Sequence, residues 1–129
     1  MARTCEQMVA EATGRIENLD PPEVAAEIGA RGVVLVDVRS AAARAEDGAI
    51  AGSVHSDRGF IEFAADPTSE YHQSELDPSA RTILYCGGGG QSALAAATLQ
   101  DMGYSNVAHL AGGLAAWTAA GRPVSAAEG

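Results

Sequence analysis

One cysteine of this chain stands in a setting that makes a thiol reactive. Cys86 directly follows the apolar run at 82–85, and six small or polar residues come after it. They are Gly87, Gly88, Gly89, Gly90, Gln91 and Ser92. Glycines let successive backbone N–H groups turn inward, and a helix that begins near Gln91 or Ser92 adds the positive end of its dipole. Cysteines in such settings have pKa values lowered from ~8.5 to between about 3.5 and 7.5, which makes them nucleophiles at neutral pH.

The alternative interpretation of this segment is a buried structural cysteine followed by a flexible turn. Cysteine is often buried, so its position after an apolar run does not decide the matter. A glycine in regular structure costs roughly 0.5–1 kcal/mol relative to alanine, so a run of four indicates that the backbone needs a particular shape here. The glycine run therefore favours the reactive cysteine.

Helices and strands alternate along the rest of the chain. Strands are expected at 15–19, 32–38, 82–85 and 106–110, and the segment 48–55 is expected to form a turn and a brief strand. Helices are expected at 4–13, 21–29, 41–46, 60–65, 92–102 and 113–120. This alternation predicts an α/β fold with a doubly wound, mostly parallel central sheet that is flanked by helices on both faces. Asp37, Arg39 and Cys86 all follow expected strands, at the edge of the sheet where such folds bind ligands.

Length and composition predict a single domain over 1–129, with a short N-terminal helix at about 4–13 and a core at about 15–124. The chain has 129 residues, of which 47% are hydrophobic, which is enough for a core without disulfides. Its net charge of −9 argues against nucleic acids and anionic membranes as partners. Cys5 and Cys86 are its two cysteines and lie in different contexts, so we expect a reducing compartment, the cytoplasm. The N-terminal segment lacks the apolar centre of a signal peptide, and no run reaches transmembrane length.

Four short motifs occur together in an order that is known from one protein family. They are Asp37-Val38-Arg39-Ser40, the segment 48–55, the loop at Cys86, and the segment 111–117, Ala-Gly-Gly-Leu-Ala-Ala-Trp. Over about residues 16–124 the chain resembles rhodanese-like domains. The resemblance implies a sulfurtransferase whose cysteine takes a sulfane sulfur from thiosulfate as a persulfide and passes it to cyanide or a thiol. It implies no metal and no organic cofactor.

The resemblance also implies roles for the loop residues. Cys86 would be the nucleophile and sulfur carrier, and the amides of Gly87 to Gly90 would hold the incoming anion and the persulfide. Ser92 would cap the helix or donate a hydrogen bond to the bound anion. The expected partners are a small sulfur-containing anion or a low-molecular-weight thiol, with a protein as a further candidate sulfur acceptor.

The chain departs from the family pattern at the end of this loop. Many active members have an arginine at the position of Gln91, and the lost ionic contact is worth about 1.5–3 kcal/mol in a partly desolvated site. Arg58 is a candidate replacement for this charge, or else a solvated surface arginine. Arg39, beside Asp37, is expected to form a structural ion pair or to clamp loop carbonyls. A second departure is Ala49, where the family commonly has histidine.

Two further function classes have to be weighed. Phosphatases with a similar loop close it with an arginine, which is absent here, so phosphate ester hydrolysis is not expected. A low-turnover persulfide carrier, or a sulfur-sensing or sulfur-binding domain, is the alternative that Gln91 favours. His55, His72 and His109 show no spacing that aligns them with Cys86, so we expect structural or exposed histidines and no metal site. His109 comes near the end of an expected strand, which makes it a candidate for the mouth of the site.

Overall fold

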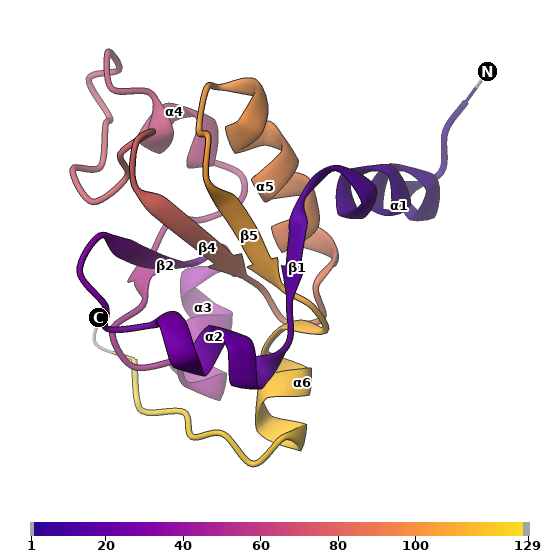
Figure 1. Ribbon diagram of the computed structural model, residues 1–129, viewed down its shortest axis with the longest axis vertical. Helices are drawn as coiled ribbons and strands as arrows, with labels where there is room; N and C mark the ends of the chain where they lie inside the picture. Colours follow the sequence, from indigo (N-terminus) through magenta and orange to yellow (C-terminus); the bar gives the residue numbers. More distant parts are fainter. Residues whose placement is uncertain (1, 128–129) are drawn as a thin grey trace.

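The computed structural model describes residues 2–127 of the chain, which form a parallel five-stranded sheet surrounded by helices (Figure 1). The strands are β1 (Glu17–Leu19), β2 (Val33–Asp37), β3 (Val54–His55), β4 (Arg81–Tyr85) and β5 (Val107–Leu110). Their order across the sheet is β1-β5-β4-β2-β3, and every neighbouring pair is parallel. The predicted α/β fold with a parallel sheet is confirmed. Cys86 follows β4, the central strand.

Helices cover both faces of the sheet, and alternate residues of the strands pack against them. The helices are α1 (Cys5–Arg15), α2 (Pro21–Glu27), α3 (Ala41–Asp47), α4 (Ile61–Ala65), α5 (Gly90–Asp101) and α6 (Gly113–Ala119). Buried residues of α1, α4 and α5 form one core with Val36 and Leu84. Buried residues of α2 and α6 form a second core with Leu35, Ile83 and Tyr85. In Figure 1, α4 and α5 lie above the strands and α2 and α6 lie below them.

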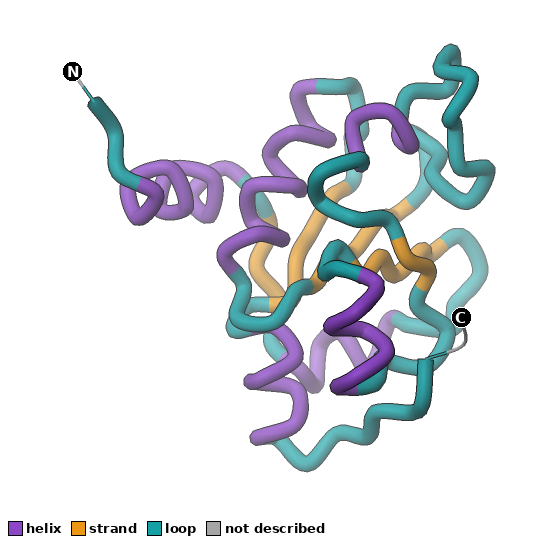
Figure 2. Tube along the Cα trace, turned by 180° about the vertical axis from the view of Figure 1, so that it is seen from behind, coloured by secondary structure: helices purple, strands orange, loops and turns teal. Residues whose placement is uncertain are grey.

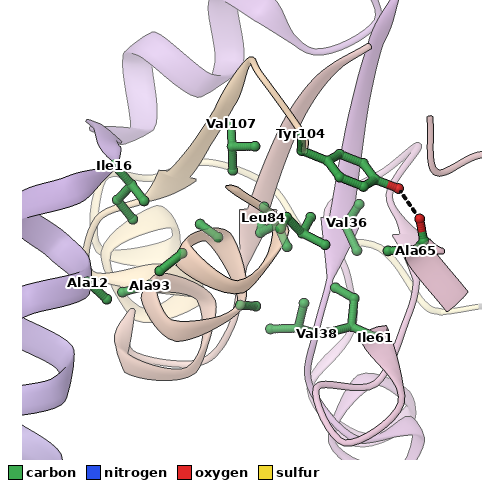
Figure 3. Close-up of a cluster of buried hydrophobic side chains, with 14 of the residues drawn as sticks. Ala12, Ile16, Val36, Val38, Ile61, Ala65, Leu84, Ala93, Tyr104 and Val107 are labelled. Atoms are coloured by element: carbon green, nitrogen blue, oxygen red, sulfur yellow. Dashed lines mark hydrogen bonds between the residues drawn. The ribbon is translucent and has the colours of Figure 1, made fainter. Parts of the chain in front are cut away.

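The core beneath α5 is built from small and branched side chains. Figure 3 shows Ala93 of α5 between Ala12 of α1 and Leu84 of the central strand, with Ile16 on the same side as Ala12. Alanines on α5 let this helix lie close to the sheet, which brings its N-terminus to the end of β4. The packing of α5 therefore positions the loop that begins at Cys86.

Most helices near the N-terminus have conventional caps, whereas the two helices beside Cys86 do not. Thr4, Asp20 and Ser40 each accept a hydrogen bond from a backbone N–H in the first turn of α1, α2 and α3. In contrast, α5 and α6 begin after Gly89 and Gly112, which have left-handed backbones and offer no side chain. The first N–H groups of these two helices are thus left for other acceptors.

The N-terminal helix runs further than its sequence predicts. It was expected to end at Gly14, but α1 continues through Gly14 to Arg15. Arg15 forms an ion pair with Asp101 of α5, and Ala12 and Ile16 are buried, so packing against α5 outweighs the roughly 1 kcal/mol that a helical glycine costs. Figures 1 and 2 both show α1 extending away from the other helices. Within residues 2–127, no helix has the length and apolarity needed to cross a bilayer.

Candidate active site

The thiol of Cys86 lies in a nest of backbone amides. Its Sγ accepts hydrogen bonds from the N–H of Gly89 at 3.1 Å and from the N–H of Ser92 at 3.3 Å. The residue is 4% exposed. Both amides belong to the first turn region of α5, so the sulfur sits at the positive end of a twelve-residue helix. Such a site favours an anionic sulfur.

The glycines of the loop have different roles. Of the four, Gly89 has a positive φ of 104°, and a Cβ there would lie 3.1 Å from the backbone nitrogen of Gly112. Gly87 and Gly88 have open space where a Cβ would be. Gly89 is therefore required by the backbone shape, whereas Gly87 and Gly88 keep the approach to the sulfur free of side chains.

The N-terminus of α6 holds the other side of the loop. The N–H groups of Leu114 and Ala115 donate to the carbonyls of Cys86 and Gly87 at 2.8 and 3.0 Å. Gly113 has a φ of 63°, and a Cβ on it would lie 2.5 Å from the Cys86 carbonyl oxygen. The Gly112-Gly113 motif thus lets α6 bind the carbonyls of Cys86 and Gly87, so that the N–H groups of the same peptide units, those of Gly87 and Gly88, point away from α6.

A pocket of about 970 Å³ opens over the cysteine. Its lining includes Val38, Arg39, Ser40, Asp57, Arg58, Cys86, Gly87, Gly88, Gly90, Gln91 and Leu114. In the part of the chain that the structure describes, the N–H groups of Gly87, Gly88, Gly90 and Gln91 donate to no backbone carbonyl outside α5. These amides are available to an anion that enters the pocket.

Asp37 and Arg39 form a buried ion pair beside this pocket. Nε and Nη2 of Arg39 donate to the Asp37 carboxylate at 3.0 and 2.7 Å, and Nη2 also donates to the carbonyl of Gly48 at 2.7 Å. Arg44 adds a second guanidinium at 3.0 Å from the same carboxylate. Burial by itself raises the pKa of Asp37, but the hydrogen bonds from Arg39 and Arg44 outweigh it and hold the pKa below its ordinary value. The hydrogen bond to Asp37 raises the pKa of Arg39.

Arg58 and Gln91 both line the pocket, but neither places a free positive charge against the sulfur. Nη1 of Arg58 lies 3.2 Å from the Glu62 carboxylate, and its Nη2 donates to Thr98 at 3.4 Å. Gln91 is exposed at the start of α5. The charge that Arg58 was a candidate to supply is therefore shared with Glu62, four residues further along the chain.

The structure brings one histidine to the cysteine, which sequence spacing did not indicate. Nδ1 of His109 lies 2.9 Å from the hydroxyl of Ser92, and that hydroxyl lies 3.5 Å from Sγ of Cys86. His109 is 3% exposed, and burial lowers its pKa. The contact arises because His109 and Leu84 are partners in the register of β5 and β4, and residues two apart on a strand share a face. Strand pairing, rather than spacing along the chain, was the missing signal.

The other two histidines contact backbone carbonyls. Nε2 of His55 lies 2.7 Å from the Arg39 carbonyl, and Nε2 of His72 lies 2.8 Å from the Leu76 carbonyl. Among residues 2–127, no three His, Cys, Asp or Glu side chains gather as a metal site requires.

Comparison with known proteins identifies the family. The rhodanese-like domain family matches residues 20–120, which is most of the chain. The chain belongs to the rhodanese-like domain family. A curated relative in this family is a sulfurtransferase of Allochromatium vinosum, 33% identical over 97 residues, which are 75% of this chain and 82% of the relative. Another is the thiosulfate sulfurtransferase GlpE of Pseudomonas entomophila, 35% identical over 96 residues, which are 74% of this chain and 80% of the relative.

A solved structure agrees with this rhodanese-like domain over nearly its whole length. A protein of unknown function from Rhodopseudomonas palustris, described as a possible tyrosine phosphatase, superimposes with a TM-score of 0.91 and 41% identity. The match covers 97% of this chain and 96% of that chain. The N-terminal helix that precedes the family match at residue 20 is therefore included in the likeness.

Proposed function

We propose that this rhodanese-like domain is a sulfurtransferase that moves a sulfane sulfur from thiosulfate, or a related donor, to cyanide or a thiol. The carrier is a persulfide on Cys86. The observation that carries the proposal is the placement of Sγ: two backbone N–H groups donate to it at 3.1 and 3.3 Å, and it lines a pocket of about 970 Å³. The sulfurtransferase relatives support the same activity.

The reaction consists of two nucleophilic displacements. The Cys86 thiolate attacks the outer sulfur of thiosulfate, a new S–S bond forms, and the bond to the sulfonate sulfur breaks with its electron pair. Sulfite leaves, and an anionic persulfide remains on the cysteine. Cyanide or a thiolate then attacks the outer sulfur, the S–S bond breaks, and the Cys86 thiolate is restored. Each step conserves charge, so the site has to stabilise anions throughout.

The loop amides can stabilise the anion at both stages. The N–H groups of Gly89 and Ser92 bond to Sγ, and those of Gly87, Gly88, Gly90 and Gln91 line the pocket without such an acceptor. Fixed N–H donors of this kind need no reorganisation when charge moves along the S–S axis. The pocket also leaves room for a small sulfur anion or a low-molecular-weight thiol as partner.

The decisive experiment is thiocyanate formation from thiosulfate and cyanide by the purified protein. Cys86→Ser should abolish turnover, whereas Cys5→Ser should retain it, because Cys5 is exposed on α1. The mass of the donor-treated protein should rise by one sulfur atom in the wild type and in Cys5→Ser, but not in Cys86→Ser. A persulfide without turnover would indicate a carrier or another donor, and the absence of both would refute the proposal.

Phosphate ester hydrolysis has less support. The structural relative from Rhodopseudomonas palustris is described as a possible tyrosine phosphatase. However, no arginine occurs between residues 87 and 121, so the loop offers no guanidinium to a phosphoryl group in transfer.

A further inference from the structure

A chain of hydrogen bonds links the cysteine to the far edge of the sheet. It runs from Sγ of Cys86 to the Ser92 hydroxyl at 3.5 Å, from there to Nδ1 of His109 at 2.9 Å, and from Nε2 of His109 to the Asn18 side-chain oxygen at 2.8 Å. Cys86, Ser92 and His109 are buried. The chain joins α5, β5 and β1, segments that are up to 91 residues apart in sequence.

The direction of these hydrogen bonds follows from Asn18. Its side-chain nitrogen donates to the carbonyls of Thr13 and Ile16 at 3.0 and 3.1 Å, so its oxygen is the atom that faces His109. That oxygen can only accept, so Nε2 of the neutral imidazole carries the hydrogen and Nδ1 presents a lone pair. Nδ1 therefore accepts from the Ser92 hydroxyl.

The Ser92 hydroxyl has one proton and two nearby acceptors. The Gly89 carbonyl lies at 3.3 Å and Nδ1 of His109 at 2.9 Å, so the shorter bond goes to the histidine. The lone pairs of the same oxygen are then left for the S–H of Cys86. Cys86 and Ser92 thus each donate toward His109, which is the order that a proton needs to leave the thiol.

Few charged side chains lie around His109 that could exchange a proton with its imidazole or with the Cys86 thiol in place of Ser92. The imidazole is faced by Leu84 from β4, by Asn18 from β1 and by Ser92 from α5. Arg15 of α1 pairs with Asp101 of α5, and Glu17 of β1 pairs with Arg81, all at the surface or partly buried. At the cysteine end, the charged residues that line the pocket are Arg39, Asp47, Asp57 and Arg58. None of these side chains hydrogen-bonds to Sγ or to the imidazole within residues 2–127.

We propose that His109 acts through Ser92 as the proton acceptor that generates the Cys86 thiolate. The S–H bond breaks and its proton passes to the Ser92 oxygen, while the hydroxyl proton of Ser92 passes to Nδ1 of His109. Sulfur keeps the electron pair, and the resulting imidazolium donates back through Ser92 to the thiolate. His109 touches no substrate and is a positioning residue. The inference rests on the proposed function only in one respect, namely that the thiolate then attacks a sulfur donor.

The imidazolium can persist during sulfur transfer. Attack of the thiolate on thiosulfate produces a persulfide anion and sulfite, so the negative charge on the cysteine side chain is retained and no proton is needed. Burial lowers the pKa of His109, and an anion at the other end of the hydrogen-bond chain opposes that effect by stabilising the protonated ring. The relay therefore couples the charge of the histidine to that of the sulfur.

The test is the pH dependence of Cys86 alkylation by iodoacetamide, followed by protein mass, with all variants in a Cys5→Ser background. His109→Asn keeps a polar group beside Ser92 but cannot take up a proton. It should raise the pH of half-maximal alkylation by about one unit or more. Asn18→Asp places a carboxylate opposite Nε2, which stabilises the imidazolium, and should lower that pH by about half a unit or more.

Asn18→Ala is the matched control, because it removes the same amide without adding charge. Asn18 is exposed, so both variants at this position are expected to fold even if His109→Asn does not. The proposal is overturned if folded His109→Asn alkylates with the wild-type midpoint, or if the Asn18→Asp midpoint is no lower than that of Asn18→Ala. Alkylation needs no sulfur donor, so this result is independent of whether the chain transfers sulfur from thiosulfate.

Discussion

At Gln91 this chain has a neutral side chain where many active members of its family have an arginine. It is exposed at the start of α5 and lines the pocket over Cys86. A glutamine amide donates a hydrogen bond but brings no charge, while the arginines in the lining, Arg39 and Arg58, are paired with Asp37 and Glu62. In the proposed reaction, anions are therefore held mainly by backbone amides, and a single side chain should be able to change the affinity of the site for a dianion.

Gln91→Arg should lower the KM for thiosulfate about tenfold, equivalent to about 1.4 kcal/mol, because a guanidinium adds a charge-assisted contact to an open and partly solvated pocket. The measurement is thiocyanate formation at varied thiosulfate concentration. Gln91→Met, which has a similar length and no charge, should leave KM within about twofold of the wild type. Equal KM values for the two variants would show that charge is not what the loop lacks.

At the scale of elements, the site depends on two helix N-termini that meet at one loop. The amides of α5 bond to Sγ of Cys86, and those of α6 bond to the carbonyls of Cys86 and Gly87. The two sets of donors act on neighbouring parts of one loop: α6 holds the carbonyls of Cys86 and Gly87, and the start of α5 holds the sulfur. The position of α6 is thus as important for the cysteine as that of α5, although α6 contributes no N–H to the sulfur.

Gly113→Ala should lower the free energy of unfolding by about 1–3 kcal/mol, because its Cβ would lie 2.5 Å from the Cys86 carbonyl oxygen in a backbone of positive φ. Urea unfolding measures the change. Gly88→Ala is the control for stability, since nothing lies within 4 Å of its Cβ position, and it should shift the free energy by less than about 0.5 kcal/mol. Similar losses in both variants would contradict the role assigned to α6.

At the scale of the whole molecule, the ion pair between Asp37 and Arg39 connects segments that lie far apart in the sequence. Asp37 is fully buried, and Arg39, Arg44 and the Tyr85 hydroxyl all donate to it, so it joins β2, α3 and β4. Arg39 continues the network to the Gly48 carbonyl, and the next residue, Ala49, pairs with Ser125 near the C-terminus. One carboxylate therefore anchors segments from the middle and the end of the chain.

Asp37→Asn should reduce the free energy of unfolding by about 3–5 kcal/mol at pH 7, because it leaves buried guanidinium groups without their anion. The pKa of Asp37 is below its ordinary value of 3.8 in the folded protein, so its contribution is present above about pH 4 and is lost as the pH falls further. The difference in the free energy of unfolding between wild type and Asp37→Asn should accordingly be smaller at pH 3 than at pH 7. Denaturant unfolding at both pH values measures this difference.

Asp101→Asn is the matched control for this experiment. Asp101 is an exposed carboxylate that pairs with Arg15, and its removal should change stability by less than about 1 kcal/mol at pH 7. A difference between wild type and Asp37→Asn that stays constant from pH 7 to pH 3 would refute the linkage to Asp37.

Much of this architecture could be predicted from local sequence, and the remainder depends on contacts between distant segments. The apolar runs that end at Asp37 and Tyr85 predicted buried parallel strands, and Cys86 with its glycines predicted the loop. The continuation of α1 through Gly14 depends on α5, and the pairing of Arg58 with Glu62 depends on side-chain conformation. The link from His109 to Cys86 depends on the register between β4 and β5, which no local pattern encodes.

The depth of Cys86 determines which atom an approaching molecule meets. Its own sulfur belongs to a residue that is 4% exposed and that lines the pocket together with the loop. A sulfur–sulfur bond is about 2 Å long, so a persulfide carries its outer atom that much closer to solvent. Bulky thiols and protein disulfides then reach the transferred sulfur before they reach the cysteine, which protects the carrier from mixed disulfides with other proteins.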